Sequence, residues 1–106
     1  MNRLMNKEVE SLVSQIRRRY NPQRIILFGS FARGDYDKYS DIDMLIIKDT
    51  NKRFLDRIGE VLNACDYSRP FEPLVYTPEE IADMSRWNFF IKRVLKEGKV
   101  LYERKR

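Results

Sequence analysis

Residues 25–47 (IILFGSFARGDYDKYSDIDMLII) hold most of the side chains in this sequence that could do chemistry. Asp41 and Asp43 stand two positions apart, at the start of an apolar run that ends at Ile47. Residues two apart in a strand point to the same face, about 6.5–7 Å from each other, so we expect the two carboxylates side by side. An unpaired buried carboxylate is unfavourable, so this pair needs a cation. Mg²⁺ takes oxygen ligands and keeps positions open for water and phosphate.

A Gly-Ser pair ends the apolar run before these aspartates. Gly29 allows close approach of the backbone to a phosphate, and Ser30 offers a hydroxyl at the start of a short helix, where free N–H groups favour an anion. The alternative is a simple turn at Gly29 and a helix cap at Ser30. Arg33, in the first turn of that helix, contacts a phosphate or faces water. Metal-binding carboxylates beside a phosphate cradle indicate phosphoryl or nucleotidyl transfer.

A third carboxylate is needed to complete such a site. The two-metal scheme for nucleotidyl transfer places cations about 3.5–4 Å apart and requires two or three carboxylates around them. Glu72, near the start of another apolar strand, is the candidate, either as a metal ligand or as a group that helps to deprotonate the acceptor hydroxyl. Its alternative is an exposed glutamate at a strand end. For Asp41 and Asp43 the alternative is a strand cap, which explains Asp43 poorly because it interrupts an apolar run.

Other polar and aromatic residues carry weaker expectations. Asp35, Asp37 and Ser40 could assist the site, but loop capping explains them better, and Tyr36 and Tyr39 are candidates for stacking on a base or a partner. The aromatic residues of the segment 87–90 are expected in the core; exposed, they would mark a protein interface. They are Trp87, Phe89 and Phe90.

Composition narrows the class of protein. The 106 residues predict one domain, 1–106, and the absence of histidine excludes Ser-His-Asp and Cys-His catalysis and the usual zinc sites. The single Cys65 suits a reducing cytoplasm, and no apolar run reaches the roughly 20 residues of a membrane span. The net charge of +5 is spread along the chain. It fits nucleic acid, an acidic partner or a phosphorylated ligand such as ATP, and decides between none of them.

The pattern of apolar residues predicts an α/β (α+β) fold, a small mixed β-sheet with helices packed on it. Helices are expected over residues 6–20, 51–65 and 87–96, with short ones from Ser30 and Pro78, and strands over 24–28, 41–47, 72–76 and 100–102. Pro73 predicts that its strand lies at an edge. The buried side of the first helix is expected to hold Met5, Val9, Leu12, Val13, Ile16 and Tyr20. That of the second is expected to hold Phe54, Leu55, Ile58, Val61, Leu62 and Cys65.

These residues resemble the nucleotidyltransferases of the DNA polymerase beta superfamily. The matching pattern is an apolar strand, Gly29-Ser30, ten residues, and then Asp41-Ile42-Asp43 at the start of a second apolar strand. Four segments resemble the compact prokaryotic branch, the minimal nucleotidyltransferases. They are GSFARG (29–34), SDID (40–43), EPLVYTPEE (72–80) and KEGKVLY (96–102).

The resemblance implies a polymerase-beta-like nucleotidyltransferase core. By it, Gly29 and Ser30 would bind the triphosphate of ATP, with Arg33 near it, and Asp41 and Asp43 would bind Mg²⁺, two ions in all. The third carboxylate of the superfamily is often aspartate, whereas Glu72 stands here. The compact branch is also similar to the antitoxin half of toxin–antitoxin modules. Characterised members transfer AMP from ATP to a tyrosine of a helical HEPN-class toxin, which is an RNase.

Three functions stay open at this point. The first is transfer of AMP to a hydroxyl of a partner protein, which the lack of a recognisable acceptor domain favours. The second is a non-catalytic module that neutralises a toxin by occlusion. The third is transfer to a small molecule or a nucleic acid, for which a homo-oligomer could build the acceptor pocket. Direct nucleic-acid binding is not expected, since no basic run dominates the sequence.

Overall fold

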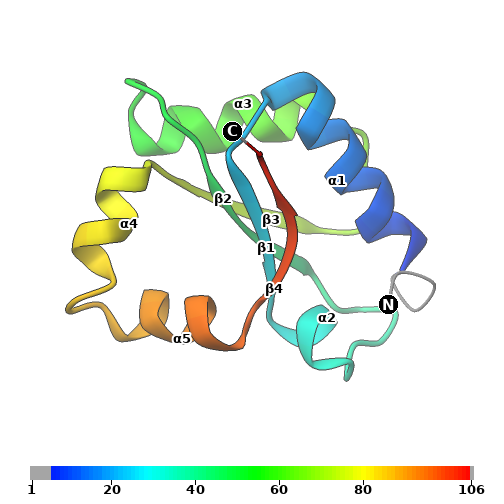
Figure 1. The fold of residues 1–106 in the computed structure, drawn as a ribbon. Coiled ribbons are helices and arrows are strands. Elements are labelled where there is room, and N and C mark those ends of the chain that lie inside the picture. Colours follow the sequence, from blue (N-terminus) through cyan, green and yellow to red (C-terminus); the bar gives the residue numbers. More distant parts are fainter. Residues whose placement is uncertain (1–5, 106) are drawn as a thin grey trace.

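A computed structural model describes residues 6–105, in which four strands form one sheet between two pairs of helices (Figure 1). The helices are α1 (Lys7–Tyr20), α2 (Ser30–Arg33), α3 (Phe54–Ala64), α4 (Pro78–Met84) and α5 (Phe89–Glu97). The strands are β1 (Arg24–Phe28), β2 (Ile42–Ile47), β3 (Phe71–Tyr76) and β4 (Lys99–Glu103). The predicted mixed α+β architecture is confirmed. None of the described helices is long and apolar enough to cross a membrane.

The strand order β3-β2-β1-β4 places the two strands of the predicted site in the middle of the sheet. β1 pairs antiparallel with β2 and with β4, and β2 pairs parallel with β3. The parallel pair requires a crossover, which α3 supplies. β3 lies at an edge, as Pro73 predicted, since proline cannot donate to a central ladder.

Each face of the sheet has its own hydrophobic core. Met44 and Ile46 of β2 belong to the core beneath α1 and α3, whereas Leu45 and Ile47 belong to the core beneath α4 and α5. Because side chains alternate along a strand, Asp43 shares the face of Leu45, that of α4 and α5. By the same alternation, Glu72 of β3 shares the face of Leu74. The strand pattern therefore places both carboxylates on one face.

Two predictions about burial are wrong. Leu55 is 77% exposed, because the side of α3 that packs inward is the one that buries Arg57 and Val61. The aromatic residues expected in the core are exposed, since the inward positions of α5 belong to Ile91 and Val94. The exposed fractions are 59% for Trp87, 84% for Phe89 and 46% for Phe90.

The first helix agrees with its predicted face. Its buried apolar residues are Val9, Leu12, Ile16 and Tyr20, and Val13 is partly buried. Met5 lies outside the described residues. Cys65 is buried, as expected, and follows the last residue of α3.

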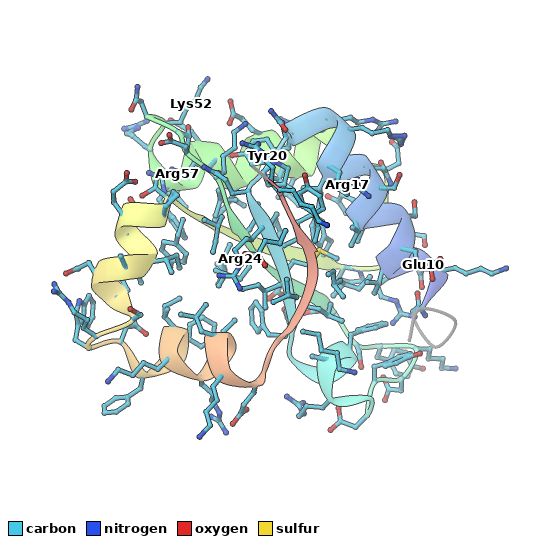
Figure 2. All side chains as sticks on the ribbon, viewed as in Figure 1. Glu10, Arg17, Tyr20, Arg24, Lys52 and Arg57 are labelled. Atoms are coloured by element: carbon cyan, nitrogen blue, oxygen red, sulfur yellow. The ribbon has the colours of Figure 1, made fainter. Side chains whose placement is uncertain are left out.

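An ion pair fixes the end of the sheet away from α2. Arg57 is 7% exposed and donates to Glu80 Oε1 at 2.8 Å, to Glu80 Oε2 at 3.2 Å and to the carbonyl oxygen of Val75 at 3.2 Å. Glu80 also completes a capping box with Thr77 at the start of α4. Figure 2 shows Arg57 at this end, with Tyr20 and Lys52. The Arg57–Glu80 ion pair thus lies at one end of the sheet, and the candidate site lies at the other end.

Candidate functional site

The three predicted carboxylates meet where β2 and β3 begin. Asp41 directly precedes β2, Asp43 is the second residue of that strand, and Glu72 is the second residue of β3. Asp43 and Glu72 are register partners across the parallel pair. Asp41 and Asp43 are half-buried, and Glu72 is exposed. The sheet therefore brings together carboxylates that are about thirty positions apart in the sequence.

These carboxylates shift one another's pKa values through their charges and hydrogen bonds. Burial raises the pKa of Asp43, and the negative charge of Asp41 raises it further; a hydrogen bond with Glu72 and the charge of Arg33 act in the opposite direction. The pKa of Glu72 is raised by a hydrogen bond with Asp41, then by burial and by the charges of both aspartates. Because the repulsion opposes full ionisation of the cluster, a cation among the carboxylates would stabilise the charged form.

The three carboxylates fit a metal ion that is bound partly by the protein and partly by the substrate. Among residues 6–105, no three His, Cys, Asp or Glu side chains already surround a single cation position. Mg²⁺ is commonly bound by one or two carboxylates together with substrate phosphates rather than by a cage made of protein alone. Asp41, Asp43 and Glu72 supply only oxygen ligands, which is what this cation prefers.

Gly29 touches the carboxylate cluster directly. Its backbone has φ +75°, which side chains rarely allow, and a Cβ at this position would overlap Asp43 Oδ2. The carbonyl oxygen of Gly29 accepts from the backbone N–H groups of Ala32 and Arg33, each at 3.1 Å, which closes the turn into α2. Ser30 is the first residue of α2. The Gly-Ser turn and Asp43 are therefore neighbours in space, as the predicted cradle requires.

Arg33 lies next to this turn but does not bind the carboxylates. Its Nε is 3.2 Å from Asp35 Oδ2, and the side chain is 64% exposed. Its positive charge is nevertheless among those that act on Asp43. Arg33 also borders a cavity of about 350 Å³ beside Gly29.

The loop before Asp41 is held by a residue that the sequence analysis did not single out. Arg69 donates to the carbonyl oxygens of Asp37 and Ser40, both at 2.9 Å, and to Glu8 Oε1 at 3.1 Å. Asp37 accepts from the backbone N–H of Tyr39, which agrees with loop capping. No local pattern signals Arg69, because its partners are far away in the sequence.

The two loop tyrosines have different surroundings. The ring of Tyr36 stacks on that of Phe31, with centroids 4.0 Å apart, so Phe31 covers one face of the Tyr36 ring. Tyr39 is 78% exposed. The ammonium group of Lys38 lies over the Tyr39 ring, 5.2 Å from its centroid. Of the two, Tyr39 is thus the more available for a partner or a base.

Comparison with known proteins agrees with this geometry. Residues 9–102 match the family described as nucleotidyltransferase domain. A Methanocaldococcus jannaschii protein named "putative protein adenylyltransferase" is 36% identical over 110 aligned residues, which cover 92% of this chain and 100% of that protein. A second protein of that name from the same organism is 27% identical, over 96% of this chain and 74% of its own length.

The fold has a counterpart among solved structures. A crystal structure from Sulfolobus solfataricus, described as that of a "putative nucleotidyltransferase", aligns with a TM-score of 0.66 and 24% sequence identity. The alignment covers 94% of this chain and 81% of that one. At this identity the match concerns the fold alone. The sequence match over residues 9–102 shows that the chain belongs to the nucleotidyltransferase domain family and is a nucleotidyltransferase enzyme.

Proposed function

We propose that this enzyme transfers AMP from ATP to a hydroxyl of a partner protein, most specifically a tyrosine of a helical HEPN-class toxin that it silences as an antitoxin. The observation that carries the proposal is the pairing of Asp43 with Glu72 across β2 and β3, with Gly29 in contact with Asp43. This arrangement sets carboxylates and a phosphate-accessible backbone turn within one site.

The reaction is a displacement at phosphorus. The acceptor oxygen attacks the α-phosphorus of ATP, a new P–O bond forms, the bond to the β-phosphate breaks, and pyrophosphate leaves with its electron pair. The proton of the acceptor hydroxyl passes to a carboxylate or to water. Mg²⁺, with Asp41, Asp43 and Glu72 as ligands, would neutralise the triphosphate and favour the ionised acceptor.

Each side chain has a position suited to its role. Asp41, directly before β2, and Asp43, within it, would supply oxygen ligands. Gly29 and Ser30 offer backbone N–H groups and a hydroxyl at the turn into α2, where the triphosphate would lie. Glu72 is the most exposed of the three carboxylates, so an acceptor can approach it from solvent. Arg33 adds positive charge beside the turn.

Two observations support a protein as the acceptor. The Methanocaldococcus jannaschii relatives are named protein adenylyltransferases, with one aligned over its whole length. The aromatic residues Trp87 and Phe89, two positions apart in the sequence, are 59% and 84% exposed, as in a protein-binding surface.

The test is transfer of label from α-labelled ATP. The purified chain is incubated with ATP and Mg²⁺, with and without the protein encoded by the neighbouring gene, and Asp43→Asn serves as the matched control. Label that moves to a tyrosine of the partner, and that is lost with Asp43→Asn, is the expected result. If the partner binds tightly and none of the four nucleotides labels it, the proposal that the enzyme modifies this partner is wrong.

The exposed aromatic residues favour a second candidate, neutralisation of a toxin by occlusion alone. In that case Asp43→Asn would protect against the toxin as well as the unchanged chain does. Protection that requires Asp43 excludes occlusion as the sole activity.

A further inference from the structure

We propose that the nucleoside part of the triphosphate binds in the cavity between β1, α2 and α5, with Phe90 against the base and Glu97 as acceptor for its donor groups. This inference rests on the proposed function, because it takes a nucleoside triphosphate as the substrate. It assigns a binding role to α5, which the sequence analysis did not connect with the site.

The cavity is continuous with the predicted phosphate site. Its volume is about 350 Å³, and its walls include Phe28, Gly29 and Arg33 on one side. Cavities of about 300–1,000 Å³ are typical of small-molecule sites. Since Gly29 both contacts Asp43 and lines this cavity, an α-phosphate beside Asp43 would lie at the mouth of the cavity, and the nucleoside bonded to it could enter.

Helix α5 gives the opposite wall its chemistry. Phe90, Arg93 and Glu97 follow one another at spacings of three and four, which places them on one side of the helix. The ring of Phe90 packs at an interplanar angle of 80° on Phe28, with centroids 5.5 Å apart, while 46% of the residue stays exposed. An aromatic ring held in this way can stack on a base.

The charged side chains of this wall suit the phosphates, the sugar hydroxyls and the amino group of a nucleotide. Arg93 Nε and Glu97 Oε1 are 3.5 Å apart, and the two side chains are 76% and 63% exposed, so neither is committed to a buried ion pair. Arg93 and Arg33 line the same cavity and add positive charge near the phosphates. The Glu97 carboxylate accepts hydrogen bonds, which sugar hydroxyls and the exocyclic amino group of adenine donate.

Gly98 keeps the end of α5 close to β1. A Cβ on Gly98 would overlap Ile26 Cγ2 and the carbonyl oxygen of Val94, both at 2.6 Å, and would lie 3.0 Å from the carbonyl oxygen of Leu27. The chain therefore passes from α5 into β4 directly against the strand that ends at Phe28. This close packing fixes Glu97 beside the Gly-Ser turn.

The order of the strands separates the two substrates. Along the end of the sheet come Glu72 on β3, Asp43 on β2, Phe28 and Gly29 at the end of β1, and Gly98 before β4. A nucleoside on the α5 side of Gly29 leaves the Glu72 side open. The acceptor hydroxyl would then approach the α-phosphorus from the Glu72 side, in line with the bond to the leaving pyrophosphate.

The test compares binding of ATP with binding of inorganic tripolyphosphate, which lacks the nucleoside. Both are measured by calorimetry with Mg²⁺ on the unchanged chain and on Phe90→Ala, with Phe89→Ala as the matched control on the same helix. We expect Phe90→Ala to weaken ATP binding about tenfold and to leave tripolyphosphate unchanged, since stacking on an aromatic side chain stabilises a base. Phe89→Ala should change neither, because Phe89 is not among the residues that line this cavity.

A second variant guards against a folding defect in Phe90→Ala. Glu97→Gln changes a 63% exposed carboxylate, and Glu10→Gln on α1 makes the same change on the other face of the sheet (Figure 2). We expect only Glu97→Gln to weaken ATP binding, again without an effect on tripolyphosphate.

The outcomes separate this inference from the proposed function. If Phe90→Ala and Glu97→Gln bind ATP as tightly as the unchanged chain, the nucleoside lies elsewhere and the inference is overturned. If the variants behave as expected while no label reaches a partner protein, the cavity assignment stands and the proposed acceptor is wrong. An unchanged chain that binds neither ATP nor tripolyphosphate overturns both.

Discussion

The carboxylate of Asp43 lies where a side chain on Gly29 would have to stand. Gly29 directly follows β1, whose last residue, Phe28, is the register partner of Asp43 in the antiparallel strand β2. Glycine at this position therefore does two things, since it adopts φ +75° and it leaves room for the Asp43 carboxylate. The Gly-Ser turn and Asp43 therefore depend on each other sterically.

We expect Gly29→Ala to abolish transfer. The new methyl group must displace Asp43 Oδ2, and the backbone strain lowers the free energy of unfolding by about 1–3 kcal/mol. Transfer is measured with α-labelled ATP, and stability by denaturant unfolding.

Gly34→Ala is the matched control for this change. Gly34 has φ +88°, so alanine there meets a similar strain, but nothing lies within 4 Å of the added Cβ. We expect a comparable loss of stability with transfer preserved. If the two variants lose transfer equally, the contact with Asp43 is not what makes Gly29 necessary.

Asp43→Asn should separate activity from stability. Transfer should fall about a hundredfold or more, because a charged ligand is lost from the centre of the site. The pKa of Asp43 is raised in the folded state, chiefly by burial, so the stability that this group contributes is present at low pH and is lost as the pH rises through its pKa. At pH 7 without metal, the neutral amide should therefore raise the melting temperature. A lower melting temperature would contradict this electrostatic account.

Glu72 should be essential by its charge and adjustable in its length. We expect Glu72→Gln to lower the rate of transfer about a hundredfold with ATP affinity nearly unchanged, if this carboxylate acts on the acceptor hydroxyl. Glu72→Asp should keep part of the rate, because aspartate is common at this position in the superfamily that the sequence resembles. Since Glu72 is exposed, neither change should alter stability by more than about 0.5 kcal/mol. A rate of transfer by Glu72→Gln equal to that of the unchanged chain would exclude a role for the carboxylate.

The ion pair at the other end of the sheet should govern stability alone. Glu80→Gln leaves the Arg57 charge, in a residue 7% exposed, without its carboxylate, and we expect a loss of about 2 kcal/mol in the free energy of unfolding. The loss is placed below the range for fully buried pairs because the Glu80 side chain is 41% exposed. Transfer should not change, since Arg57 lies at the end of the sheet away from α2 (Figure 2).

The same pair predicts a dependence on pH. The hydrogen bond and charge of Arg57 lower the pKa of Glu80 from its ordinary value of 4.5. The stabilisation is therefore complete above pH 4.5 and is lost as the pH falls through the lowered pKa of the folded state. Glu80→Gln should flatten this part of the stability curve. An unaltered acid profile would show that other carboxylates control it.

The sequence predicted the centre of the site better than its walls. Asp41, Asp43 and Gly29 stand within one short segment, where strand alternation and a turn residue fix their relative positions. Glu72 could be proposed because it opens an apolar strand, although its pairing with Asp43 depends on the register of a parallel sheet. These features are local or follow from strand order.

The walls depend on contacts that no periodicity encodes. Phe90 was expected in the core because aromatic residues usually are, but α5 turns Ile91 and Val94 inward instead. A shift of one residue along a helix turns a side chain by about 100°, so Phe90 lies outside the face that buries Ile91 and Val94. Arg69 was not found for a related reason, since its partners come from residues near positions 8 and 40.

Pro73 follows Glu72 on the outermost strand of the sheet. A proline has no backbone N–H, so the free margin of β3 cannot offer an unbroken ladder to an incoming strand. Under the proposed function, a protein acceptor would therefore not pair its main chain along this edge. Its recognition would depend on the shape of a folded partner, which presents its hydroxyl group from a helix or a loop. The enzyme would then select a surface rather than a sequence.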